Sequence, residues 1–198
     1  TVAAISELIE YYKGVFYILS QCASRQLEEV TFRRTVIPVS ELSEAAEKYF
    51  RKVSRGVAAS VVFSIETVSE SVIGDVNQLH FLLENLIDEA LSVPVAGKIR
   101  LTCAVEDDFV RFLFTDMRRE KTREELNQLF YPNLVRMTAG EKGKLCGTEY
   151  LLCKQIIRDH DEFAGRRGCR INAEPAEKGG FSVYFTLPRY LKRIQPRR

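Results

Sequence analysis

The sequence has little of what several common classes of protein require. No apolar run approaches the roughly 18 residues that a membrane-spanning helix needs, and no signal-peptide pattern is present. The 29 basic and 27 acidic residues nearly balance, whereas a dedicated nucleic-acid binder normally carries a lopsided positive charge. Glycine is scarce, with 11 among 198 residues. We therefore expect no direct membrane span and no nucleic-acid partner.

The sequence also has few residues that could form a metal site or a set of disulfides. The five cysteines are odd in number, none of them has the Cys-x-x-Cys spacing, and the two histidines, His80 and His160, are far apart. This set fits neither a zinc site nor a disulfide framework, and reduced thiols in a cytoplasmic protein are the better interpretation. Because the chain begins at Thr1 and not at Met, we expect a fragment of a larger, membrane-anchored or soluble protein.

What the sequence does contain is a series of helical and strand patterns. Hydrophobic residues make up 45% of the chain, which suffices for a core. Apolar residues at helical spacing predict an amphipathic helix within residues 1–28. A strand over Val30–Val39 follows, then a helix that Ser40 would cap, then a strand over Val57–Ile65.

The clearest helix begins at Gly74-Asp75. Asp75 is a suitable N-cap, and Gln78, three residues later, would complete a capping box. Beyond the helix, apolar and polar residues alternate over Ile99–Val105 and Val110–Phe114. The acidic turn between these two runs predicts a β-hairpin.

The C-terminal part is predicted to hold a long loop, a helix and a hairpin. Residues 116–146 are polar, with at most a short helix near Glu124–Phe130. A last helix over Gly147–Asp159 precedes a hairpin of Cys169–Glu174 with Phe181–Leu187. The order of elements predicts an α+β fold: a two-layer α/β sandwich, its sheet mixed but mainly antiparallel, with helices on one face and an N-terminal helix in front.

Four motifs, in order, carry a resemblance to a known family. They are Gly74-Asp75 running into Asn85–Leu91 (like GD…L…NLLxNAL), the hairpin leading into Asp116 (like D-x-G-x-G), Glu124–Pro132 (like E-x-L-x-x-I-F-x-P), and Leu151–Ile157 with Phe181–Pro188 (like A-I-V-K-x-I-V and F-x-F-x-L-P). With this order and spacing, the chain resembles the ATP-binding catalytic domain of sensor histidine kinases. That domain has the GHKL (Bergerat-type) ATPase fold, which gyrase and MutL share.

The resemblance implies a nucleotide site. In the family a helix ends in Asn-x-x-x-Asn, and its second asparagine holds Mg²⁺ against the phosphates. An aspartate bonds the adenine amino group, and two glycine boxes let the backbone approach the nucleotide. Asn85, Asp116 and Gly147 match the nucleotide-binding positions. Asn85 and Glu89 stand at the metal positions, and ATP with Mg²⁺ is the implied ligand.

The chain departs from the family pattern at this same site. Glu89 replaces the second asparagine; a carboxylate can bind Mg²⁺, but it would repel a triphosphate by about 4 kcal/mol at 4 Å and an effective ε of 20. Arg118 and Glu120 replace the glycines of the first box, and Leu145 and Glu149 those of the second. We interpret the chain as a degenerate member with ATP binding lost or much weakened, no cofactor and no catalytic residue.

A phosphoacceptor histidine is also missing. The predicted first helix contains no histidine, and a phosphoacceptor upstream of Thr1 stays possible. His160-Asp161-Glu162 looks like a phosphoacceptor motif, but its register matches the end of the family's last helix. We interpret His160 as structural, and we expect His80 to pack or to face solvent.

A basic cluster follows Asp116: Arg118, Arg119, Lys121 and Arg123. It is either a solvated loop face or a contact surface for an acidic partner, such as a receiver domain. The leading hypothesis is a histidine-kinase-like domain of a signalling protein that acts by protein contact, without phosphoryl transfer. Two alternatives stay open. One is a divergent but competent ATP- and Mg²⁺-binding kinase domain of a two-component sensor; the other is a scaffold or anti-factor module that binds its partner through the basic cluster.

The chain is expected to have three segments. Residues 1–28 would form a linker helix or the remnant of a dimerisation helix, whose apolar face needs the domain itself or a second subunit as its partner. Residues 29–189 would form the histidine-kinase-like ATPase domain, and residues 190–198 a basic tail. Other domains of the same polypeptide are further candidate partners.

Overall fold

The computed structural model describes residues 32–57, 59–131 and 148–191. In chain order its elements are β1 (Thr35–Pro38), α2 (Val39–Val53), the 3₁₀ helix η1 (Ser54–Gly56), β2 (Val61–Glu66), β3 (Ser71–Gly74), α3 (Val76–Leu91), β4 (Gly97–Glu106), β5 (Phe109–Asp116), α4 (Arg123–Asn127), α5 (Thr148–Phe163), β6 (Ile171–Pro175) and β7 (Phe181–Pro188). The N-terminal helix predicted within residues 1–28 and the glycine box at Gly147 lie outside the described residues.

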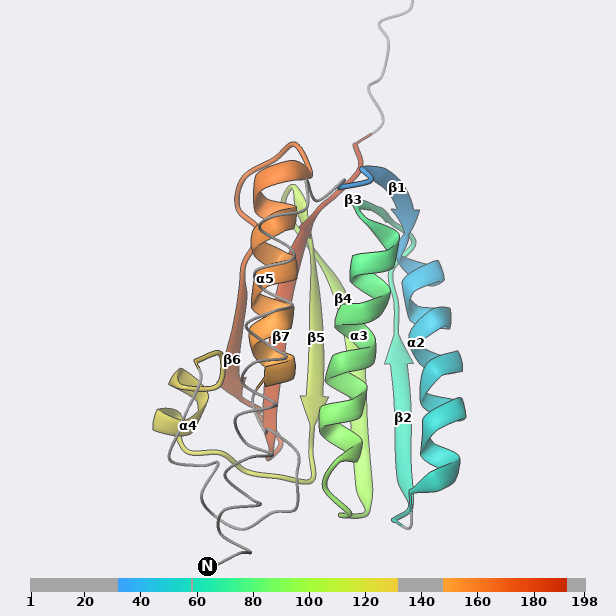
Figure 1. Ribbon diagram of the computed structural model, residues 1–198, viewed down its shortest axis with the longest axis vertical. Coiled ribbons are helices and arrows are strands. Elements are labelled where there is room, and N and C mark those ends of the chain that lie inside the picture. The colour runs from blue at the N-terminus through green and yellow to red at the C-terminus, as the bar shows by residue number, and fades with distance from the viewer. Residues whose placement is uncertain (1–31, 58, 132–147, 192–198) are drawn as a thin grey trace, which may run out of the picture.

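A five-stranded sheet in the order β2-β4-β5-β7-β6 forms one layer of the fold. The pair β2–β4 is parallel, and the other three pairs are antiparallel. Helices α2, α3 and α5 lie side by side on one face of this sheet, and β1 and β3 form a small separate ribbon at its upper end (Figure 1). The predicted α+β two-layer sandwich with a mixed, mainly antiparallel sheet is confirmed.

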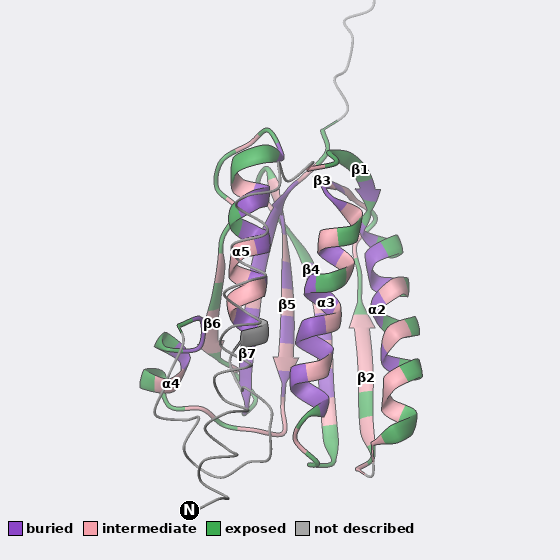
Figure 2. Cartoon of the chain, in the orientation of Figure 1, coloured by how far each residue is buried: buried purple, intermediate pink, exposed green. Residues whose placement is uncertain are grey.

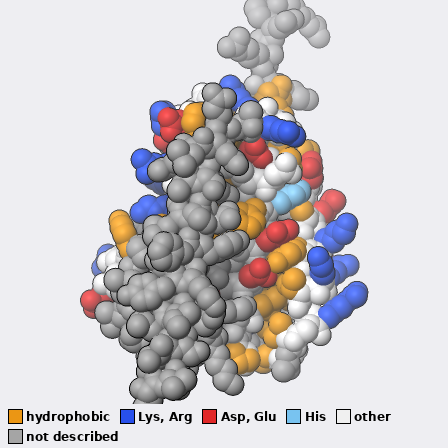
Figure 3. All heavy atoms as spheres, viewed as in Figure 1, with side chains coloured by type: hydrophobic (Ala, Val, Ile, Leu, Met, Phe, Trp, Pro, Cys, Tyr) orange, Lys and Arg blue, Asp and Glu red, His pale blue; other side chains and the backbone are white. Residues whose placement is uncertain are grey.

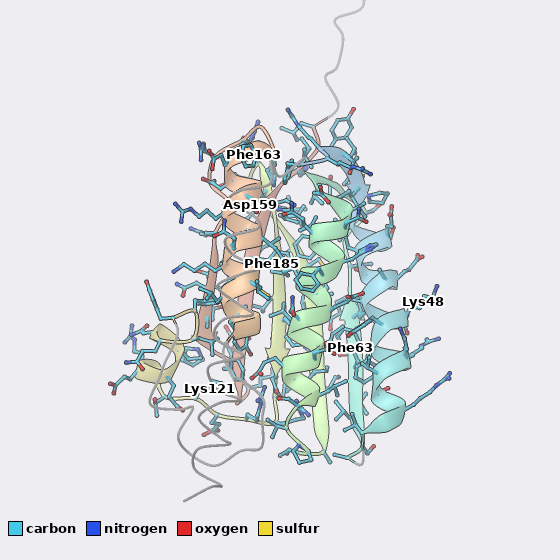
Figure 4. The ribbon with its side chains drawn as sticks, viewed as in Figure 1. Lys48, Phe63, Lys121, Asp159, Phe163 and Phe185 are labelled. Carbon is cyan, nitrogen blue, oxygen red and sulfur yellow. The ribbon has the colours of Figure 1, made fainter. Side chains whose placement is uncertain are left out.

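The core lies between the helices and the sheet (Figure 2). Along β5 buried and half-buried residues alternate strictly, as expected for a strand with one face on the core. Phe112 of β5 and Phe185 of β7 stack there with ring centroids 4.8 Å apart. The opposite side of α2 carries exposed basic residues at the edge of the molecule (Figure 3), where Lys48 points away from the domain (Figure 4).

Helix α2 (Val39–Val53) begins two residues earlier than predicted. Pro38, in an extended conformation, is its N-cap, and no side chain caps it, so the prediction that Ser40 caps this helix is wrong. The N–H of Val39 instead donates to the carbonyl of Glu70 at 2.9 Å. Because this carbonyl satisfies an otherwise unpaired N–H of the first turn, the helix needs no hydroxyl cap there.

Asp75 caps α3 as predicted, with its side chain accepting from the N–H groups of Asn77 and Gln78. The prediction that Gln78 completes a capping box is wrong. The N–H of Asp75, which the Gln78 side chain would accept in such a box, donates instead to Nε2 of His160 at 3.1 Å. His160 is fully buried, which confirms its structural role. A histidine 85 residues away has taken the place of the local partner.

Strand β3 and the end of helix α5 also differ from the prediction. Strand β3 has only four residues and was not predicted, because so short a run shows no period. Helix α5 extends to Phe163, four residues beyond the predicted end. Of the described cysteines, Cys103 and Cys169 are free thiols. Within the described ranges none of the helices has the length and apolarity required to cross a bilayer.

Candidate functional site

Asp116 ends β5 and lies at the centre of the site that the sequence indicated. Its strand neighbours are Ile99 of β4 and Phe181 of β7, and the residue is 1% exposed. The turn before β7 packs against its backbone: Gly180 has φ +83°, and a Cβ there would overlap the carbonyl oxygen of Asp116. Only glycine fits this approach, so the backbone around Asp116 is tightly fixed.

The carboxylate of Asp116 accepts four hydrogen bonds from Arg118 and Arg119, in the loop after β5. Oδ1 accepts from the backbone N–H of Arg118 at 3.0 Å and from its Nε at 2.9 Å. Oδ2 accepts from Nη2 of Arg118 and from Nε of Arg119, both at 2.8 Å. A carboxylate offers about four lone-pair positions, so its acceptor capacity is filled by the protein's own arginines.

Arg118 also bonds to the C-terminal end of α3. Its Nη2 donates to the carbonyl of Ala90 at 2.6 Å, and its Nη1 donates to that of Val95 at 2.9 Å. Carbonyls at a helix C-terminus lack partners within the helix and carry partial negative charge, so a cation there is stabilising. Arg118 therefore ties the end of α3 to the end of β5.

The metal positions lie on α3, one turn apart and both buried. Glu89 is 8% exposed and lies 3.5 Å from Nη1 of Arg119. The amide of Asn85 donates to the carbonyl of Phe81, on its own helix, at 2.9 Å. Arg119 thus bridges Glu89 and Asp116, which are the two carboxylates of the site.

The pKa values reflect this pairing. Burial acts to raise the pKa of Asp116, but the hydrogen bonds from Arg118 and the charges of both arginines outweigh it and lower the pKa. Burial likewise acts to lower the pKa of Arg119, but the charges of Asp116 and Glu89 raise it. The Asp116 carboxylate and the Arg119 guanidinium are therefore held charged at neutral pH.

The structure divides the predicted basic cluster in two. The side chains of Arg118 and Arg119 are 1% and 14% exposed, so the interpretation of these two as a solvated face is wrong; their carboxylate partners draw them inward. The ammonium of Lys121 lies 5.2 Å from the ring centroid of Phe181, near α4 (Figure 4). Arg123, at the start of α4, is exposed.

Sequence reasoning missed two features of the site. The first is that Arg118 turns back onto Asp116; the two-residue spacing allowed this, but only the end of α3 fixes the direction. The second is Tyr150 in the first part of α5, which is 4% exposed. Burial raises its pKa well above the usual value, and the charge of Glu89 adds to the effect. No motif of the sequence marked this tyrosine.

The residues do not fit a nucleotide and its metal as they stand. Asp116 has no free lone pair for an adenine amino group, and Glu89 is already paired with a guanidinium. Within the described part of the chain, no group of three or more His, Cys, Asp or Glu side chains is arranged to hold a metal ion. A groove of about 790 Å³ includes Pro38, Glu70 and Arg189; it lies by β1 and β3, at the other end of the domain (Figure 1).

The fold and the aspartate at the end of β5 together define a domain of the GHKL ATPase class. The profile described as "Histidine kinase-, DNA gyrase B-, and HSP90-like ATPase" matches residues 74–191, which is more than half of the chain. The chain therefore belongs to this family. No curated protein sequence matches the chain significantly.

Solved structures support the same fold. The catalytic domain of histidine kinase ThkA has 22% identity and a TM-score of 0.59, and the match covers 79% of this chain and 98% of that one. The mycobacterial sensor histidine kinase MprB has 16% identity and a TM-score of 0.59, covering 80% of this chain and 98% of that one. ThkA in complex with the response regulator protein TrrA has 21% identity and a TM-score of 0.64, covering 94% of this chain and 52% of that one.

Proposed function

We propose that this chain is a degenerate histidine-kinase-like domain of a signal-transduction protein, which binds no nucleotide and acts by contact with other proteins. The observation that carries the proposal is the filled carboxylate of Asp116. Recognition of adenine at this position requires a free acceptor. A nucleotide would have to break the buried ion pair of Arg118 with Asp116, and breaking such a pair costs about 3–5 kcal/mol.

The pairing at Glu89 supports the same conclusion. In the competent alternative, Arg119 or Lys121 would neutralise phosphates and Glu89 would help to hold Mg²⁺. In the structure Arg119 neutralises Glu89 and Asp116 instead. A nucleotide would have to take this guanidinium from two buried carboxylates, and the carboxylates would then repel its phosphates.

A signalling partner is proposed from the relatives. ThkA has been solved in complex with a response regulator, and we propose a partner of the same class, or another domain of the same polypeptide. Arg123 is the member of the basic cluster proposed for such a contact, since it is exposed. Arg123→Glu should weaken receiver-domain binding in a pull-down with the full-length protein, while Arg55→Glu, at the exposed η1, should not.

The deciding experiment is a calorimetric titration of the folded protein with ATP in excess Mg²⁺. The expected result is no binding heat above dilution at millimolar ATP, together with no shift of the melting temperature. Micromolar binding would overturn the proposal and support the divergent but competent kinase domain. Circular dichroism of the same sample confirms that the protein is folded.

A further inference from the structure

We propose that the site at Asp116 has become a guanidinium-binding site whose resident ligand is the side chain of Arg118. The site is formed by the carboxylate of Asp116 and the carbonyl oxygens of Ala90 and Val95, and is called here the acceptor site. The proposal deepens the proposed function and rests on it, because it states what occupies the position that a nucleotide has left.

The match of donors to acceptors carries the proposal. A guanidinium has five N–H donors and no acceptor, and the acceptor site takes four of those donors: Nε, both hydrogens of Nη2, and Nη1. Two of the bonds form the bidentate fork that guanidinium and carboxylate groups make best. Adenine carries ring nitrogens that need donors, and the acceptor site offers them none.

Shape agrees with the chemistry. The aliphatic part of Arg118 passes directly over Gly97, where a Cβ would come within 2.8 Å of Cγ of Arg118. Gly97 also has φ +139°, a conformation that other residues rarely adopt. The side chain of Arg118 is 1% exposed. The acceptor site is thus closed around one guanidinium and its stem.

The neighbouring arginine serves as an internal comparison. Arg119 also bonds to Asp116, but its Nη2 is buried without a hydrogen-bond partner, and its side chain is more exposed than that of Arg118. Arg118 is therefore the ligand that the acceptor site fits, and Arg119 balances the remaining charge.

The test is chemical rescue. Arg118→Ala keeps Cβ and removes the remainder of the side chain, which ethylguanidinium replaces. We expect the variant to melt about 5–10 °C below the parent, as for the loss of one partner of a buried ion pair. Saturating ethylguanidinium should raise its melting temperature by about 3 °C or more and leave the parent and Arg123→Ala unchanged.

Two further compounds, ethylammonium and adenosine, test whether the rescue requires a guanidinium group. Ethylammonium carries the same charge without the planar fork, and it should rescue the variant far less. Adenosine should not rescue it. Equal rescue by ethylammonium, rescue by adenosine, or no rescue at all would overturn the proposal.

A second measurement uses the parent and does not depend on how the variant folds. In the NMR spectrum of arginine side chains, the Nε–H of Arg118 should exchange with solvent about tenfold or more slowly than that of Arg123, because it is buried and bonded. Equal exchange rates would contradict the proposal. Binding of ATP to the parent, by contrast, would defeat the proposed function itself, and failed rescue without ATP binding would defeat only the guanidinium-binding site.

Discussion

At the scale of single residues, His160 shows how burial and hydrogen-bond partners determine the protonation state of a side chain. Nε2 accepts from the N–H of Asp75 at 3.1 Å, so Nδ1 carries the proton and donates to the carbonyl of Ile156 at 2.8 Å. Burial lowers the pKa of His160 below 6.5, and the Ile156 carbonyl and the charge of Asp75 offset only part of that effect. The folded protein therefore favours the neutral ring.

The sign of the pH dependence follows from the lowered pKa. The contribution of neutral His160 to the free energy of unfolding is complete above pH 6.5, the ordinary value, and is lost as the pH falls through the lowered value. Urea unfolding between pH 8 and pH 5 should show this loss. His160→Gln, which keeps an acceptor and does not titrate, should have a flatter profile; an equally steep profile would contradict the assignment.

Asp116 is the residue on which the site depends most. Asp116→Asn removes the charge that two arginines share and should cost about 3–5 kcal/mol, since it leaves buried cations without their partner. Equilibrium unfolding in urea measures this cost. Glu66→Gln is the matched control, because Glu66 is exposed and lies 3.7 Å from its arginine; it should change the free energy of unfolding by about 0.5 kcal/mol or less. Similar effects of the two substitutions would contradict the special position of Asp116.

At the scale of elements, the N-terminus of α3 joins parts of the chain that are far apart in sequence. Asp75 caps Asn77 and Gln78, and its other oxygen accepts from the N–H of Arg33 at 2.8 Å. Asp75→Ala should therefore cost about 1–2 kcal/mol in urea unfolding. Asn77 is exposed in the same first turn, and Asn77→Ala should change the free energy of unfolding by about 0.5 kcal/mol or less. Equal losses of stability in the two variants would indicate that helix propensity, and not the N-cap hydrogen bonds of Asp75, determines the change.

The same elements show how far the sequence predicts the structure. The helix of α3 and the hairpin of β4 with β5 follow from short-range periods that the residues themselves carry, and the order of elements was enough for the fold. The roles of Gln78 and Arg118 were not predictable in this way. The first depends on His160, 85 residues away, and the second on the carbonyls at the end of α3. Contacts of that kind are decided by tertiary packing, on which a local pattern holds no information.

At the scale of the whole molecule, the scaffold and the site have separate physical origins. The core between sheet and helices uses buried apolar side chains, such as Phe112, Leu101 and Phe185. The site uses charged groups at one end of this scaffold, where two arginines pair with Asp116. The scaffold can therefore tolerate changes at the site, because the two sets of residues stabilise different contacts.

The stacked pair at the centre of the sheet provides the test of that separation. Phe112 and Phe185 are 0% and 1% exposed, with their rings 3° from parallel. Phe112→Ala should lower the free energy of unfolding by about 3–5 kcal/mol, a large part of the roughly 5–15 kcal/mol that stabilises a domain. Val62 is 57% exposed on the edge strand β2, and Val62→Ala should lower it by about 0.5 kcal/mol or less. Because Phe112 lies in the core and not at the site, Phe112→Leu, which should still fold, is expected to keep the slow exchange of the Arg118 Nε–H. Loss of that protection in a folded Phe112→Leu protein would show that site and scaffold are one cooperative unit.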